Sequence, residues 1–405
     1  MKPRRELYSS CGVASGSQAE KMSAPILSPR EALITLNLIP GLGSVRIQSL
    51  LEFFGSAELV LAAGSNMLER VPRIGAKMAN AIANWHNCTN VQAELECAAH
   101  YGVRIVTLTD EDYPHALRRM SDPPIVLYVL GEWAQEDEHH AVSIVGSRAA
   151  TPYGMTVARR FGRELADAGC TIISGLAKGI DTAAHRGALD AGGRTIAVLG
   201  HGLSQIFPQE NAELAQQIIM GHGAVVSEFP MNLRPGRTTF PQRNRIVAAW
   251  SRATLVVEAP SHSGALHTAH ISGTDYGNTV FAIPGMVDKP TSIGCHALIR
   301  DGATLCTSPT ELMSDMGWNA PPRQMELFCE ATASQPQEPK NPSYAVTLAP
   351  QATDEILCAI HAGHDTLDAL CSALGHPAHV LTPQLMRLQV MRRIIPLPGG
   401  RYQAT

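Results

Sequence analysis

Features of several common protein classes are missing from this 405-residue sequence. Its nine cysteines are scattered and form no CxxC pair, which argues against a disulfide framework or structural zinc and fits a reducing cytosol. No apolar run approaches the roughly 18 residues that a membrane helix needs. Residues 1–28 are polar and lack the apolar stretch of a secretory signal, so we expect a disordered tail on a cytoplasmic protein.

Sequence fingerprints of cofactor sites are missing as well. No GxGxxG follows the first expected strand, and no GxxxxGKS/T loop occurs, which disfavours dinucleotide binding and nucleoside triphosphate hydrolysis. His262, His267 and His270 lie close together, but no carboxylate or cysteine completes a metal-binding spacing. We therefore predict no metal and no cofactor. The net charge of −4 counts mildly against nucleic-acid binding, unless basic residues concentrate locally.

The length suggests two to four domains, and residues 29–109 are expected to form a helical one of the helix-hairpin-helix (SAM-like) type. We predict helices as far as residue 118. Residues 38–51 and 71–82 share one pattern: an apolar residue, a proline, a glycine turn and an amphipathic helix. Such a turn frees backbone N–H groups for a phosphate. Arg73 replaces a hairpin glycine in the second copy, and a helical bundle without a ligand explains the pattern equally well.

Residues 110–318 are expected to form a Rossmann-like α/β domain. Short apolar runs alternate with segments of helix length, at residues 141–145, 170–173, 195–199, 224–227, 254–257 and 280–283. This alternation predicts a doubly wound, mostly parallel sheet with helices on both faces.

The remaining residues are expected to form a linker and a small last domain. Residues 319–350 are rich in Pro, Gln, Ser and Ala, which is typical of a linker. Residues 351–405 predict a winged helix. A helix is expected over residues 381–388, with Thr382 as its N-cap and Pro383 in its first turn. A hairpin then turns at residues 398–400.

Glycines and polar residues gather after the expected strands, where doubly wound sheets bind ligands. The candidate residues are Gly146, Ser147, Arg148, Ser174, Gly175, Lys178, Gly179, Ser263 and Gly264. Small residues let a ligand approach the backbone, and helix N-termini favour an anion. Glycines also serve merely to make tight turns, but four such loops in succession favour a phosphate site.

A second concentration of charge spans residues 234–245 and contains four arginines. Guanidinium groups bind phosphate in bidentate fashion, and Phe240 can stack on a base. Arg243, Asn244 and Arg245 at the expected helix start therefore form a candidate clamp for a DNA backbone. A solvated loop is the simpler alternative.

Taken in order, these motifs resemble the DNA-processing protein A (DprA/Smf) family. The resemblance runs from about residue 110 to 316 and is carried by residues 143–148, 174–181, 184, 185, 240–246, 257–259, 263, 264, 268, 269, 281–285 and 298–303. It implies a homodimer that binds single-stranded DNA cooperatively, protects incoming DNA during natural transformation and helps load the RecA recombinase. By position, the implied DNA contacts are Arg148, Lys178, Arg243, Asn244 and Arg245, while Ser147, Ser174, Gly175 and Gly179 shape the pocket. The sequence departs from the family pattern at Lys178, Ala265, His267 and His296.

Two other functions compete with non-enzymatic DNA binding. A nucleotide phosphoribohydrolase shares this kind of fold but carries a PGGxGT loop beside a catalytic Glu, and residues 263–268 lack the double glycine. Glu258 and Asp181 could form an acid/base pair, but we expect Glu258 to orient an arginine and Asp181 to cap the helix after Gly179. A sequence-specific regulator would read DNA with residues 382–390, where only Arg387 is basic. We therefore predict a protein that is not an enzyme.

Overall fold

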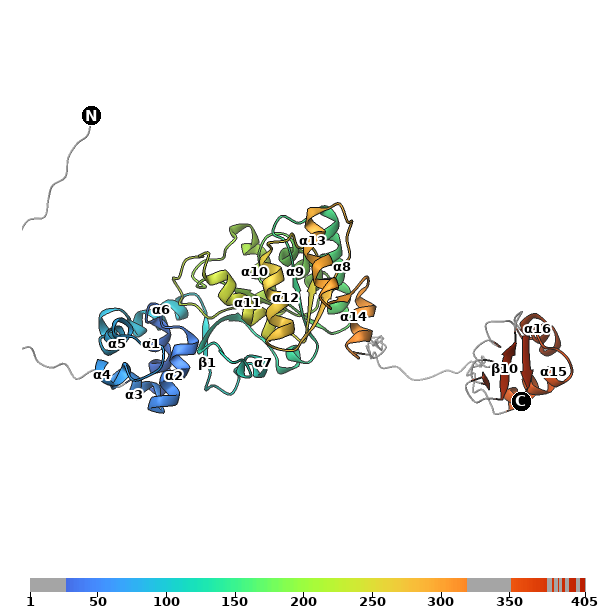
Figure 1. Cartoon of the computed structure of the whole chain (residues 1–405), viewed down its shortest axis with the longest axis horizontal. Coiled ribbons are helices and arrows are strands. Elements are labelled where there is room, and N and C mark those ends of the chain that lie inside the picture. The colour runs from blue at the N-terminus through green and yellow to red at the C-terminus, as the bar shows by residue number, and fades with distance from the viewer. Residues whose placement is uncertain are drawn as a thin grey trace, which may run out of the picture. The chain divides into compact units, whose positions relative to one another are not determined.

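The computed structural model describes residues 27–318, 351–376, 381, 385, 388, 389, 393–397 and 401–404. The chain divides into two compact units, Met1–Gln324 and Met325–Thr405 (Figure 1). The expected linker and nearly all of the expected N-terminal tail lie outside the described residues.

The first unit begins with a layer of short helices. Ser28 caps α1 (Pro29–Leu38): its hydroxyl accepts from the Glu31 N–H, and the Glu31 carboxylate accepts from the Ser28 N–H at 2.8 Å. The helices that follow are α2 (Ser44–Phe54), α3 (Ala57–Ala62), α4 (Ser65–Leu68), α5 (Ala76–Ala83) and α6 (Val91–His100). Fully buried residues such as Leu50 and Ile82 hold their apolar faces together.

The two similar segments have the same backbone conformation at their turns. Gly41 (φ 79°) and Arg73 (φ 67°) are both left-handed, and Gly43 and Gly75 begin α2 and α5 without a side-chain cap. The left-handed region suits glycine and is strained for arginine, because the Cβ crowds the backbone. The surrounding structure therefore holds Arg73 in a conformation that its side chain disfavours.

The prediction of helix throughout residues 30–118 is wrong at residues 104–107. This segment forms β1 (Arg104–Thr107), which pairs antiparallel with β2 (Val126–Gly131), and β2 pairs antiparallel with β6. Between β1 and β2 only α7 (His115–Arg118) is α-helical. Three of the four β1 residues are buried, so no polar–apolar alternation distinguishes this short strand from a helix.

The other strands of the first unit form the expected parallel sheet. They are β3 (Ala141–Val145), β4 (Thr171–Ser174), β5 (Thr195–Leu199), β6 (Gly223–Ser227), β7 (Ala253–Val256), β8 (Thr279–Ala282) and β9 (Thr304–Leu305). The order across the nine-stranded sheet is β1-β2-β6-β5-β4-β3-β7-β8-β9. Neighbours from β6 to β9 are all parallel, which confirms a mostly parallel sheet.

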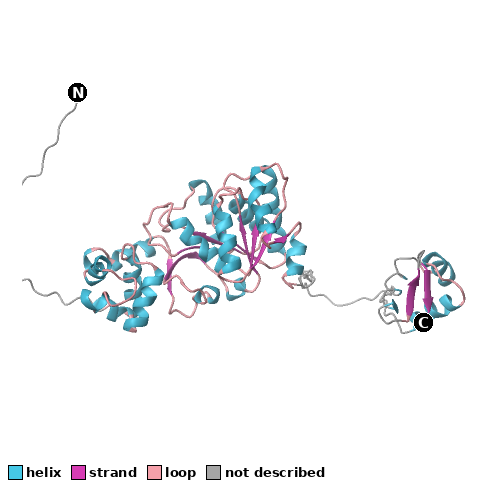
Figure 2. Cartoon of the chain, viewed as in Figure 1, coloured by secondary structure: helices cyan, strands magenta, loops and turns pink. Residues whose placement is uncertain are grey.

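Helices cover both faces of this sheet (Figure 2). α8 (Pro152–Asp167), α9 (Ile180–Asp190) and α14 (Pro309–Asp315) pack on the face to which β3 contributes Val142 and Ile144. α11 (Thr239–Ala249), α12 (Gly264–Thr274) and α13 (Ile293–Arg300) pack on the face to which β3 contributes Ala141 and Val145. The alternation of these four β3 residues is the period of two that a strand imposes.

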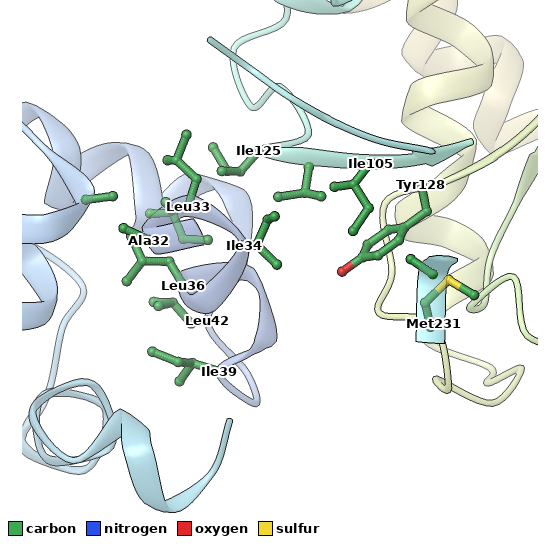
Figure 3. Packing of buried hydrophobic residues seen from close by; sticks show 14 of the residues in the cluster. Ala32, Leu33, Ile34, Leu36, Ile39, Leu42, Ile105, Ile125, Tyr128 and Met231 are labelled. Atoms are coloured by element: carbon green, nitrogen blue, oxygen red, sulfur yellow. The ribbon is translucent and has the colours of Figure 1, made fainter. Parts of the chain in front are cut away.

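The helical layer and the sheet share one apolar core (Figure 3). Ile34 of α1 belongs to the same buried cluster as Ile105 of β1 and Tyr128 of β2. α10 (Ala212–Ile219) joins this core through Leu214 and Ile218. The helical layer is therefore packed on the sheet.

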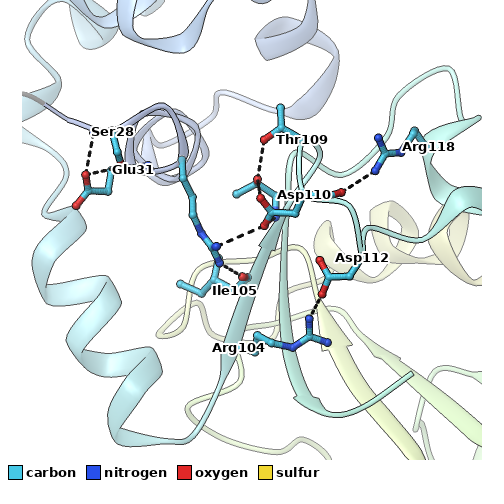
Figure 4. A network of polar contacts seen from close by, with 10 residues as sticks. Ser28, Glu31, Arg104, Ile105, Thr109, Asp110, Asp112 and Arg118 are labelled. Carbon is cyan, nitrogen blue, oxygen red and sulfur yellow. Dashed lines mark hydrogen bonds and ion pairs between the residues drawn. The ribbon is translucent and has the colours of Figure 1, made fainter. Parts of the chain in front are cut away.

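Polar contacts border this core (Figure 4). Arg30 donates to the Ile105 carbonyl and lies 3.6 Å from the Asp110 carboxylate. The same carboxylate accepts from the Thr107 N–H at 2.9 Å, so α1 is tied to the end of β1.

The second unit contains α15 (Gln351–His361), α16 (Leu367–Leu374) and an antiparallel pair of strands, β10 (Ile394–Leu397) and β11 (Arg401–Ala404). Leu381, Leu385 and Leu388 are helical and buried in its small core. The expected N-cap Thr382, Pro383 and the turn at residues 398–400 lie outside the described residues. The order of elements agrees with a winged helix, which stays a prediction.

Candidate nucleic-acid interface

The candidate residues of the sheet lie around the point where the strand order reverses. The chain runs from β3 outward through β4, β5 and β6, and then returns to β7 on the other side of β3. The loops after β3 and β7 therefore border the switch point at which doubly wound sheets bind ligands. The Ser147 N–H joins these loops by donating to the Glu258 carbonyl at 2.7 Å.

Two glycines hold the loop after β3 against the start of α9. A Cβ on Gly179 (φ 81°) would lie 2.3 Å from the Ser147 carbonyl oxygen, and one on Gly146 would lie 2.5 Å from Ile180. The Ile180 N–H donates to the same Ser147 carbonyl at 3.3 Å. The space that a Cβ would occupy at these two glycines is filled by the chain itself, so close packing requires glycine at both positions.

Ser174 and Gly175 end β4 and form the seat of Arg243. The Ser174 hydroxyl donates to the Ile144 carbonyl at 2.6 Å, which fixes the end of β4 to β3. A Cβ on Gly175 would lie 1.5 Å from Nη1 of Arg243, so only glycine leaves room for the guanidinium here. Residues from the end of β4 and from α11 therefore meet at this point.

The charge of Arg243 is buried without a direct partner among the described residues. The residue is 4% exposed, and its Nε has no hydrogen-bond acceptor among the described residues. Burial lowers the pKa of Arg243 to about 10; the negative charge of Asp181 opposes this shift, and the positive charge of Arg148 adds to it. An anion brought beside this guanidinium would stabilise it strongly, because charges interact more strongly where water is excluded.

Arg148 and Phe240 flank this buried charge. The exposed Arg148 guanidinium lies 4.7 Å from the centre of the half-buried Phe240 ring, at cation–π distance. A Cβ on Gly200, directly after β5, would lie 3.0 Å from that ring. The start of α11 therefore covers the ends of β4 and β5 with an arginine and an aromatic ring.

The two acids near the switch point are structural, and both of their predicted roles are wrong. The Asp181 carboxylate accepts from the N–H groups of Gly175 at 3.1 Å and Ala177 at 3.3 Å, so it orders the loop before α9 and does not cap that helix. Burial raises the pKa of Asp181. The Glu258 carboxylate accepts from the N–H and hydroxyl of Thr151, ahead of α8, and bonds to no arginine of the described chain.

The remaining candidates lie on exposed parts of the same rim. Lys178 forms an ion pair with Glu210 at 2.6 Å, and both side chains are more than half exposed. Asn244 donates to the Gly264 carbonyl at 3.4 Å, and Ser263 caps α12. Lys178 therefore already has an acidic partner, while Asn244 joins α11 to the loop after β7.

Arg245 has a different set of neighbours from Arg243. Its guanidinium pairs with Glu228, lies 3.3 Å from the Asp122 carboxylate and donates to the Asp122 carbonyl at 2.8 Å. The side chains of Arg245 and Glu228 are 13% and 11% exposed. The alternative prediction that Arg245 pairs with Glu258 is wrong, because two other acids hold it.

His185 is a buried group for which the sequence predicted no role. It is fully buried, its Nδ1 lies 2.7 Å from the Thr195 hydroxyl, and its Nε2 has no partner among the described residues. Burial, with a contribution from the charge of Arg243, lowers the pKa of His185 to about 3, so the ring is neutral. His185 follows Asp181 by four positions, so both residues lie on one face of α9. This spacing is the sequence feature that could have pointed to His185.

Metal binding and membrane spanning find no support in the described part of the chain. No group of three or more His, Cys, Asp or Glu side chains within it could hold a metal ion. None of its helices is both long and apolar enough to cross a membrane.

Comparison with known proteins identifies the family. Residues 104–317 match the family model of DNA recombination-mediator protein A. Protein Smf of Synechocystis sp. is 33% identical over 386 residues, which cover 90% of this chain and 96% of that protein. Protein Smf of Escherichia coli is 37% identical over 298 residues, or 73% of this chain and 76% of that protein. The crystal structure of DNA processing protein A from Streptococcus pneumoniae is similar with a TM-score of 0.61 and 31% identity, over 70% of this chain and 97% of that chain. This chain therefore belongs to the DNA recombination-mediator protein A (DprA/Smf) family.

Proposed function

We propose that this chain binds single-stranded DNA at the carboxyl ends of β3, β4 and β5, through a phosphate contact centred on Arg243. The observation that carries the proposal is an arginine that is 4% exposed and whose Nε has no partner in the described chain, with a second arginine, Arg148, close enough to lower its pKa. A phosphate oxygen supplies the missing acceptor, and guanidinium groups bind phosphate through two parallel hydrogen bonds.

The preference for single strands follows from Phe240. Its half-buried ring, with Arg148 above it, offers a stacking surface for an unpaired base. A base inside a duplex is already stacked and reaches such a surface only after it is unpaired. Phosphate contacts do not depend on the base sequence, so the site binds single strands of any sequence.

The same geometry supports binding without catalysis. Asp181 and Glu258 are the acids that an enzyme of the phosphoribohydrolase type would use, and each carboxylate is bonded to backbone N–H groups. Ser263 caps α12 in the segment where such enzymes carry a double glycine. The proposed activity therefore has no catalytic residue, metal or cofactor.

The family resemblance extends the proposal to partners. On this basis the protein is a cytoplasmic homodimer that protects incoming DNA during natural transformation and helps load the RecA recombinase. Sedimentation that shows only monomer at micromolar concentration would contradict the dimer.

A gel shift with single-stranded and duplex DNA of one length tests the central proposal. The wild-type protein should bind the single strand more tightly. Arg243→Ala should weaken binding to every single-stranded sequence by a similar factor and lower the slope of log affinity against log salt by about 0.7. Arg300→Ala is the matched control, because the end of α13 lies at the opposite end of the sheet from the strand carboxyl ends. Equal binding of both DNA forms, or an unchanged salt slope in a folded Arg243→Ala protein, would refute the proposal.

A further inference from the structure

A cleft of about 910 Å³ lies beside α11, between the sheet and the first of the two similar helical segments, residues 38–51, here called the first hairpin; residues 71–82 are the second hairpin. Its walls come from residues 37–46, from residues 228–230, 232 and 233 after β6, and from Thr239, Gln242 and Arg245 of α11, with Glu94, Asp122 and Ile125. Arg73 of the second hairpin also lines it. Sites for small ligands typically have volumes of roughly 300–1,000 Å³, so this cleft can take a nucleotide.

A single helical turn separates the cleft from the strand-end site. Thr239 and Gln242 line the cleft, whereas Phe240 and Arg243 lie against the glycines that end β5 and β4. Neighbouring residues of a helix point in directions about 100° apart, so the first turns of α11 present different residues to the two sites. A strand held at Arg243 therefore needs only to cross this end of α11 to reach the cleft.

Two arginines stand on the hairpin side of the cleft. Arg73 is exposed, adopts a left-handed φ of 67°, and has no ion-pair partner among the residues that the structure describes. Arg46 is half-buried and donates to the Gly41 carbonyl at 2.8 Å. Strained backbone in non-glycine residues concentrates at functional positions. These two guanidinium groups, beside the uncapped start of α2 at Gly43, suit a phosphate.

The other side of the cleft offers a hydrogen-bond acceptor. One carboxylate oxygen of Glu228, Oε1, is buried and has no partner in the described chain, while Oε2 pairs with Arg245. A carboxylate repels a phosphate but accepts hydrogen bonds from the exocyclic amino groups of bases. The cleft thus has a cationic wall for the backbone and an acceptor for a base.

We propose that this cleft is a second nucleotide-binding subsite for the same DNA strand. A phosphate beyond the Arg243 site binds Arg46 and Arg73, and its base enters the cleft toward Glu228. The inference rests on the proposed function, because it extends the path of the strand bound at Arg243. Cytosine and adenine provide an amino donor for Glu228, whereas thymine does not, so the cleft favours the amino-bearing bases.

Affinity of the full chain for a short thymidine dinucleotide, which has a single internucleotide phosphate, and for a long oligothymidylate of about 16 nucleotides tests the second subsite. Arg73→Gly removes the guanidinium and should fold well, because glycine favours a positive φ. It should weaken binding of the long oligonucleotide about tenfold and leave the short one unchanged, since only the long one reaches both sites. Arg73→Asn, which also tolerates this backbone conformation, should do the same. Lys77→Ala is the matched control, because it removes a charge from the same hairpin without lining the cleft.

The outcomes separate the two proposals. If Arg243→Ala weakens binding at both lengths while Arg73→Gly changes neither, the cleft is not a subsite and the proposed function stands. If Arg243→Ala changes neither length in a folded protein, the proposed function itself fails. Wild-type protein should also bind long oligodeoxycytidylate more tightly than oligothymidylate, and Glu228→Gln should reduce that difference. Equal affinity for the two sequences would overturn the contact between the base and Glu228.

Discussion

Arg243→Met should make the protein more stable and a poorer DNA binder. A pKa lowered from 12.5 to about 10 corresponds to roughly 3 kcal/mol of unfavourable energy for keeping this guanidinium charged in the fold. Methionine is long, apolar and adaptable enough to fill the same space. Asp181 loses the attraction of the guanidinium, which offsets part of the gain. We therefore expect the free energy of unfolding at pH 7 to rise by about 1–2 kcal/mol.

Urea unfolding followed by tryptophan fluorescence measures this change in the first unit alone, because all four tryptophans lie within residues 1–324. Fluorescence anisotropy with a labelled single strand measures the affinity. Loss of a charge-assisted contact to phosphate should weaken binding by about tenfold or more. Stability and affinity should thus change in opposite directions.

Arg245→Met, on the same helix, is the matched control for the stability measurement. It leaves Glu228 and Asp122 without their cation, so the free energy of unfolding should fall by about 3 kcal/mol. A destabilised Arg243→Met protein with normal affinity would show that Arg243 is a structural cation as well. In that case the DNA site would have to lie elsewhere.

Three further substitutions test single features of the site. Gly175→Ala should reproduce the affinity loss of Arg243→Met, since the new Cβ would lie 1.5 Å from Nη1, and a double-mutant cycle should show that the two losses do not add. The pKa of His185 is lowered to about 3, so the neutral ring contributes fully to the free energy of unfolding above pH 6.5, and this contribution is lost as the pH falls toward 3. In urea titrations, the free energy of unfolding of His185→Asn should therefore fall less steeply with decreasing pH than that of the wild type, by about 1.4 kcal/mol per pH unit. Lys178→Ala should weaken binding less than about threefold in the same anisotropy assay, because the exposed Lys178 side chain is already paired with Glu210.

Six of the seven strands from β3 to β9 were predictable because each is a short apolar run followed by a segment of helix length. β9 was not predicted, since its two residues are half-buried and exposed. β1 was not predicted either, because its four residues pair with residues 19 to 25 positions later in the chain and carry no pattern of their own. The general rule that ligand loops gather at strand ends placed Gly175 and Arg243 near the same rim of the sheet, but it did not predict that the glycine makes room for the guanidinium. The partners of Arg245 did not follow, because the Asp122 carbonyl that it binds lies 123 positions earlier in the chain. A local sequence pattern cannot predict a contact between residues so far apart in the chain.

The two arginines of α11 have different roles in binding. Arg245 is held by Asp122 and Glu228, which fixes the helix, while Arg243 lies two residues earlier, over Gly175, with no ion-pair partner in the described chain. Packing and the anchored helix therefore order the Arg243 side chain before any DNA arrives, so little of its conformational entropy remains to be lost on binding. Gly175 at the end of β4 makes room for the Arg243 side chain and not for the DNA. The Arg243 guanidinium in turn is available to bind a phosphate. The affinity of the site should accordingly depend on Gly175 and Arg245 as well as on the one guanidinium that meets the phosphate.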